Sequence, residues 1–193
     1  MVTAASASAQ GGGGMRPVFG GTPERPPELR AKEISRLSPA RVALDRAREI
    51  NLTPDQFRKL DSLARAYDLR AKDFSRGLDT LDGIIDRSTR DLSRDRQKAA
   101  YNANRRPPEN KREKDERARS DSADQAEVDL HLKRRTDARN AMGETLLATQ
   151  QAFDAALTAV NGILNEEQRT KLAPIFTGLT NEFTQRLHWQ NSR

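Results

Sequence analysis

Apolar and small residues recur in alternating steps of three and four along one stretch of the chain. The positions are Phe57, Leu60, Ala64, Tyr67, Ala71, Phe74, Leu78, Leu81 and Ile85. This spacing puts them along one side of an α-helix, and its regularity is typical of a helix that packs against a second helix. The pattern therefore predicts a long helix with a helical partner.

A second stripe with the same spacing lies in the C-terminal half. Its positions are Met142, Leu146, Thr149, Phe153, Ala156, Val160 and Ile163. Upstream, Val128 and Leu132 fall on the same face, but Arg135 and Arg139 interrupt it. A last stripe consists of Leu172, Phe176, Leu179, Phe183 and Leu187. We expect Pro174 to kink or interrupt that final helix unless its early position spares it.

The stretch NLTPDQF marks the start of the first long helix. Thr53 is a good N-cap, and Pro54 suits the first helical position because its missing N–H is not needed there. Gln56 can reach back to the backbone of Thr53, which completes a capping box. Leu52 can pack on Phe57 as a hydrophobic staple. We expect these residues to fix a helix start.

A looser copy of this pattern, ILNEEQR, begins at Ile163. After Leu164, Asn165 is a competent N-cap and Gln168 takes the third helical position. Arg169 replaces the staple residue, so this copy is weaker. The pattern therefore marks two helix starts, each after a tight turn from a preceding helix. Two helical hairpins with complementary stripes predict a small all-α domain.

The N-terminal residues 1–37 are rich in Gly, Pro, Ala and Ser. They predict a disordered leader, and a short helix near Glu28 to Leu37 stays open. Within it, Ala-Ser-Ala-Gln resembles the small-residue end of an export signal, but the basic and apolar regions of such a signal are absent. A truncated signal and a plain flexible tail both stay open. The folded domain is predicted over residues 38–188, starting with a short helix capped by Ser38, and residues 189–193 are a tail.

Between residues 88 and 124 the apolar pattern fails. Acids and bases alternate there, and Pro107 and Pro108 break the middle. We predict a solvated polar connector, and helices on either side of the prolines stay open. A nucleic-acid-binding arm is the sharper alternative, which the interspersed acids disfavour.

Charge and composition narrow the partners. The chain of 193 residues has 34 Lys and Arg against 28 Asp and Glu, a net charge of +6, and no cysteine. A basic balance favours acidic partners such as nucleic acid, anionic lipid or acidic client proteins, although the mixed charges also suit an ordinary solvated surface. Without cysteine there are no disulfides, thiolate metal sites or cysteine nucleophiles. No apolar run reaches the length of a transmembrane segment.

Catalytic patterns are absent from the sequence. His131 and His188 are far apart, and neither has a neighbour at ligand spacing. Carboxylates alternate with Arg and Lys at helical spacings, which indicates surface pairing. We therefore assign no catalytic, cofactor-binding or metal-binding residues and expect no enzyme activity. Glu166 and Glu167, beside a helix start, are the one alternative for a hard cation.

Two leucines lie away from the apolar stripe of the first long helix. Leu63 falls beside the stripe and Leu69 opposite it. They are candidates for contact with the short first helix, a dimer partner or a client protein. Isolated surface leucines with no function are the alternative.

The two capped turns resemble the LTxxQ motifs of the Spy/CpxP-like family of small bacterial periplasmic proteins. The first motif matches in full from Leu52 to Gln56, and the second has Asn165 in place of Thr. The order of helices is also similar over about residues 38–188. The resemblance implies a periplasmic all-α protein that forms a cradle-shaped homodimer. Branches of the family act as ATP-independent chaperones, repress an envelope-stress sensor kinase, or sense heavy metals.

Composition bears on the choice of branch. Two histidines, no cysteine and scattered methionines disfavour the metal-sensing branch. A basic, mixed-charge surface with small apolar spots suits weak binding of many client proteins. We therefore expect a non-enzymatic, ATP-independent chaperone-like or envelope-stress protein whose partners are unfolded proteins and a second copy of the chain. A metal sensor or an accessory of a sensor kinase is the alternative, and a binder of nucleic acid or anionic surfaces comes third.

Overall fold

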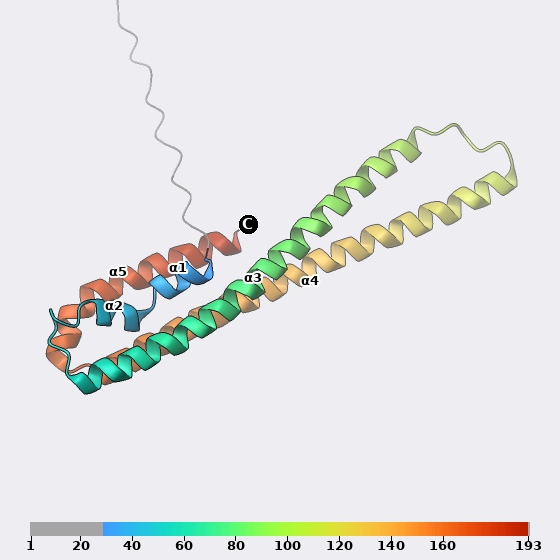
Figure 1. Ribbon diagram of the computed structural model, residues 1–193. Helices are drawn as coiled ribbons and strands as arrows, with labels where there is room; N and C mark the ends of the chain where they lie inside the picture. Colours follow the sequence, from blue (N-terminus) through green and yellow to red (C-terminus); the bar gives the residue numbers. More distant parts are fainter. Residues whose placement is uncertain (1–28, 193) are drawn as a thin grey trace, which may run out of the picture.

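The computed structural model describes residues 29–192, which form five helices and, within that range, no strand (Figure 1). In chain order these are α1 (Ala31–Arg36), α2 (Pro39–Asp45), α3 (Pro54–Ala103), α4 (Lys111–Ile163) and α5 (Glu166–Asn191). The predicted all-α fold of long helical hairpins is confirmed. Residues 1–28 and 193 lie outside the described range, and with them most of the predicted leader and its signal-like Ala-Ser-Ala-Gln.

Helices α3 and α4 form one long antiparallel hairpin, and the other helices accompany only one end of it (Figure 1). Helices α1 and α2 pack on α3, and α5 packs on α4. We call residues 29–87 and 139–192 the base, and residues 88–138, which the short helices leave uncovered, the arm. None of the described helices combines the length and the apolar character that crossing a membrane requires.

The apolar core lies in the base. The rings of Phe153 and Phe183 stack with their centroids 4.3 Å apart, and both side chains are fully buried. From α3 the buried apolar members of the predicted stripe are Leu60, Ala64, Tyr67, Ala71 and Leu78. Phe57 remains 47% exposed, so the row of buried side chains begins one step later than predicted. Pro174 lies inside α5 on its exposed side, and the helix continues through it.

The end of the predicted leader belongs to the core. Leu29, Ile34 and Leu37 are each at most 3% exposed. The predicted leader of residues 1–37 is therefore ordered and buried in its last part. Polar contacts also hold α1 on α5, since Arg186 donates to Glu33 at 2.8 Å. This hydrogen bond lowers the pKa of Glu33 below its ordinary value of 4.5. The short helix expected near residues 28–37 is present as α1, and the Gly/Pro-rich composition of the preceding residues hid only its burial in the core.

The predicted polar connector is almost entirely helical. Helix α3 continues to Ala103, and α4 begins at Lys111 after an Asn110 side chain that accepts from the backbone N–H of Glu113. Only residues 104–110, which contain both prolines, separate the two helices. The predicted tail is also shorter, because α5 extends to Asn191 and Gln190 is buried.

The side chains between α3 and α4 in the arm keep the helical spacing but are mostly polar. Ser88 and Leu92 are buried, yet the next positions along α3 and α4 carry charge. His131 lies 3.8 Å from Asp91 and 4.0 Å from Asp95. Nearer the tip, ion pairing joins Lys98 to Asp124 at 2.5 Å, and Asn102 donates to the same carboxylate. The contact between the helices therefore continues where the apolar pattern stops.

Candidate functional site

The turn before α3 ends on a residue in the left-handed conformation. Asn51 has φ 51°, and no other non-glycine residue of the described range has a positive φ. The N–H of Leu52 donates to the carbonyl of Ala47 at 2.9 Å, and the N–H of Asn51 donates to Arg48 at 3.4 Å. These are the two bonds of a Schellman turn, and asparagine tolerates the left-handed region better than most residues. The turn reverses the chain and presents Thr53 as the next N-cap.

Both predicted capping boxes are present. Thr53 Oγ1 accepts from the backbone N–H of Gln56 at 3.2 Å, and its own N–H donates to Gln56 Oε1 at 3.0 Å. At the start of α5, Asn165 Oδ1 accepts from the N–H of Gln168 at 2.9 Å, and the Asn165 N–H donates to Gln168 Oε1 at 3.0 Å. Pro54 occupies the first helical position of α3. The two motifs, more than a hundred residues apart, therefore have the same local geometry.

The two capping glutamines also bond to each other, and we call Gln56 and Gln168 the glutamine clasp. Gln56 Nε2 donates to Gln168 Oε1 at 2.9 Å, and Gln168 Nε2 donates to Gln56 Oε1 at 3.1 Å. Each amide also donates to the backbone preceding the other motif: Gln56 to Ile163 O at 3.0 Å, and Gln168 to Ile50 O at 3.2 Å. Every N–H and oxygen of both amides is thus used in joining the corners.

The clasp explains why the motif ends in glutamine. A capping box works with Glu or Gln, because the box requires only an oxygen at this position. The bond across the corners also requires N–H donors, which a carboxylate lacks. Leu164 is buried in the core beside the clasp, and Leu52 packs partly buried against that core. The motif residues are therefore occupied in holding the fold.

The structure separates the two leucines that the sequence proposed for partner contact. Leu63 is partly buried and packs against the core, whereas Leu69 is 63% exposed. Further large apolar side chains are exposed in the base and the arm: Phe57, Ile84, Tyr101, Leu130, Leu132 and Leu147. Sequence reasoning missed Leu130 and Leu147 because they fall outside, or beside, the predicted stripes.

Metal-ligating groups do not gather in the described part of the chain, where no three His, Asp or Glu residues are placed to share an ion. Glu167 instead forms an ion pair with Lys171 at 2.7 Å. The hydrogen bond from Lys171 lowers the pKa of Glu167. His188 is exposed near the end of α5, and His131 lies in the arm.

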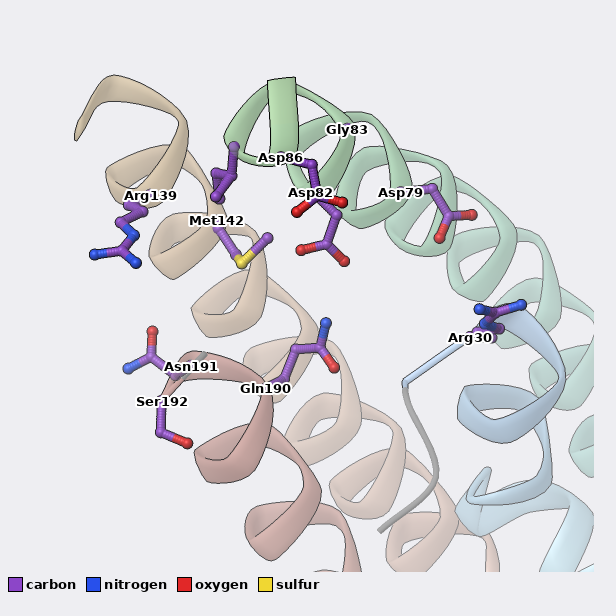
Figure 2. Close-up of a pocket in the computed structure, with 11 residues that line it drawn as sticks. Arg30, Asp79, Asp82, Gly83, Asp86, Arg139, Met142, Gln190, Asn191 and Ser192 are labelled. Carbon is purple, nitrogen blue, oxygen red and sulfur yellow. The ribbon is translucent and has the colours of Figure 1, made fainter. Parts of the chain in front are cut away.

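A cleft of about 810 Å³ lies at the boundary between base and arm, where the end of α5 and the start of α1 approach the hairpin (Figure 2). Three carboxylates of α3, Asp79, Asp82 and Asp86, line one side. Gln190 projects from the end of α5, and Met142 projects from α4 beside the carboxylates (Figure 2). The only local signal of this cleft in the sequence is the helical spacing of the three acids, a pattern that indicates surface pairing.

Neither a protein-family model, nor a curated protein, nor a solved structure matches this chain, so its resemblance to the LTxxQ proteins rests on its own residues.

Proposed function

We propose that the protein is a non-enzymatic, chaperone-like binding protein of the periplasm that holds unfolded clients without ATP, as a homodimer. The resemblance of its two capped motifs to the LTxxQ family supports the compartment and the dimer. The observation that carries client binding is the set of large apolar side chains left exposed along a highly charged hairpin. Leu69, Leu130 and Leu147 are exposed by 63%, 45% and 59%.

The arrangement suits weak and unselective binding. Each exposed leucine offers a small apolar contact, worth roughly 1–3 kcal/mol when covered. Acids and bases surround these leucines, as in the ion pair of Arg65 with Asp61 one turn before Leu69. Long-range attraction of charged segments raises the rate of encounter, and scattered apolar contacts hold many different sequences at low affinity.

The test is suppression of client aggregation without ATP. Light scattering of several thermally unfolded clients is recorded with the full chain at equimolar and fivefold ratios. We expect suppression near the equimolar ratio. The triple variant Leu69→Gln, Leu130→Gln, Leu147→Gln should need severalfold more protein for the same effect, because it loses three apolar contacts without changing charge.

A matched control replaces exposed neutral residues on the same helices: Ser62→Gln, Asn140→Gln and Gln151→Asn. Its suppression should equal that of the natural chain. Unchanged scattering with every client at fivefold excess would exclude the chaperone-like function. Equal activity of the leucine variant would show that these side chains do not contact the client.

A further inference from the structure

We propose that the cleft at the boundary between base and arm binds a linear primary alkylammonium ligand, a polyamine, between Asp79, Asp86 and the buried amide of Gln190. This inference goes beyond client binding and does not depend on it, because the cleft contains none of the exposed leucines. Four observations support the proposal: the spacing of the carboxylates, the amide without a partner, the apolar floor of the cleft and the local charge.

The carboxylates lie on one face of α3. Asp79, Asp82 and Asp86 are spaced by three and then four residues, which puts them on the same side of the helix. Asp82 already has an interaction within the protein. Asp79 and Asp86 form no ion pair with any described residue, and seven residues of helix separate them by about 10 Å. Two free carboxylates at that distance fit two separate ammonium groups.

The amide of Gln190 is the second and independent observation. The residue is only 3% exposed, and its side-chain Oε1 has no hydrogen-bond partner within the described part of the chain. Figure 2 shows the side chain extending from α5 into the space facing α3. A buried acceptor without a partner lowers stability, because it has lost its bonds to water and gained none in the protein. An ammonium group in the cleft would supply the missing donor.

The floor of the cleft is apolar. Met142 is 7% exposed and Ile85 is partly buried, and both line the cleft. Methylene groups between two ammonium ions can lie on such a floor while the charges reach Asp79 and Asp86. The volume of about 810 Å³ falls in the range of small-molecule sites. A single Ca²⁺ or Mg²⁺ ion requires oxygens within about 2.0–2.6 Å of it, and no three carboxylates of the described residues are placed to share one ion.

Charge makes the site selective. The chain carries a net charge of +6, so attraction of a polycation depends on local groups of carboxylates. Arg30 and Arg139 also line the cleft, and Figure 2 shows the guanidinium group of Arg139 directed away from the three carboxylates. A polyamine that binds this protein therefore needs the local carboxylates, and its affinity should fall with added salt.

The experiment is calorimetric titration of the full chain with spermidine, at low and physiological salt. We expect one site per chain, weakened by salt. The variant Asp79→Asn, Asp86→Asn should reduce affinity at least tenfold, and Gln190→Leu should reduce it severalfold. Circular dichroism and a melting curve check that each variant is folded. Asp79 and Asp86 are exposed, so the double variant should melt like the natural chain.

The control removes the same two charges elsewhere, through Asp115→Asn and Glu127→Gln on the arm. Equal loss of affinity in this control, or undiminished affinity in the cleft variant, would overturn the proposal. Displacement of spermidine by equimolar Mg²⁺ would overturn it as well, because the site would then recognise charge alone. Displacement of spermidine by tri-lysine that disappears in the same cleft variant would support a site for primary alkylammonium groups.

Discussion

The two halves of the long hairpin have the same helical spacing and different side chains between the helices. In the base, the helices meet through Leu60, Leu146 and Phe153, and three shorter helices cover them. In the arm, the corresponding places hold Asp95, His131 and other polar groups, and the short helices leave them uncovered. The backbone is continuous, so the difference between the halves lies in what the helices bury.

This difference concerns stability. Burial of a leucine or phenylalanine side chain contributes about 1.5–3 kcal/mol, whereas partly exposed ion pairs contribute about 0–1 kcal/mol each. Buried polar atoms without hydrogen bonds occur in both parts, for example Tyr67 Oη in the base and Asp95 Oδ2 in the arm, so the difference rests on apolar burial. We therefore expect the base to hold most of the free energy of unfolding and the arm to open locally first.

The largest effect should come from the aromatic stack of the base. Phe153→Ala removes a fully buried ring stacked on Phe183 and should lower the free energy of unfolding by about 3–5 kcal/mol. In the arm, Leu92→Ala should cost less and act only locally. Urea denaturation and amide hydrogen exchange measure both. Leu147→Ala, at a 59% exposed position of α4, is the control and should change little. A global loss from Leu92→Ala as large as that from Phe153→Ala would contradict the comparison.

A smaller effect is expected at the corner of the base. Gln168→Glu keeps an oxygen for the capping box but removes the N–H donors to Gln56 and Ile50, and it buries a charge beside their oxygens. We expect a loss of about 2–3 kcal/mol at pH 7, part of which returns as the glutamate is protonated in acid.

Thermal melts at both pH values measure the loss at this corner. Gln151→Glu, an exposed change of the same kind on α4, should leave the melting temperature nearly unchanged. If Gln168→Glu were equally mild, the capping box alone would account for the motif.

The arm should respond in the opposite direction. Replacing both members of a partly buried polar pair by apolar groups is often neutral or stabilising. Asp95→Leu with His131→Leu should therefore stabilise the arm by about 1 kcal/mol, whereas His131→Leu alone leaves Asp95 and Asp91 close together without the imidazole and should weaken it. Hydrogen exchange of amides in residues 92–102 reports both. If His131→Leu alone exchanged more slowly than the double variant, the polar contact between Asp95 and His131 would not be what limits the stability of the arm.

The smallest effect concerns acid and is confined to the base. The pKa of Glu33 is lowered by Arg186, so its stabilising contribution is fully present above the ordinary value of 4.5 and is lost as pH falls through the lowered pKa. The contribution should be below about 1 kcal/mol, since part of the pair is open to water. In Glu33→Gln the difference in melting temperature from the natural chain should shrink as the pH falls from 6 to 3. A constant difference over that range would exclude this linkage.

Much of the base could be predicted from local sequence. Thr53 and Gln56 define a helix start within four residues, and the stripe from Leu60 to Leu78 needs only the helical period. The burial of Leu29 and Ile34 was missed, although a short helix was expected near residues 28–37, because this segment adjoins a Gly/Pro-rich stretch. Across that stretch, the high content of Gly and Pro obscures the helical spacing of two or three apolar residues.

The remaining features depend on tertiary contacts. The period continues through Ser88, Asp95 and His131, but a search for apolar residues cannot see a period made of polar ones. The clasp had a visible signal, the repeated glutamine at the third helical position, yet only the folded chain brings Gln56 to Gln168. The cleft likewise joins α3 to the end of α5, which no local pattern relates.

The position of both motifs at one end of the hairpin has a consequence for the order of folding. Gln56 and Gln168 are 112 residues apart in sequence, whereas Asn102 and Asp124, near the tip, are only 22 apart. Closing the longer loop directly costs roughly 1–2 kcal/mol more in chain entropy than closing the shorter one. A chain that first pairs near the prolines and then zips toward the motifs avoids that difference. The polar arm would then influence how quickly the corners meet more than how firmly they hold.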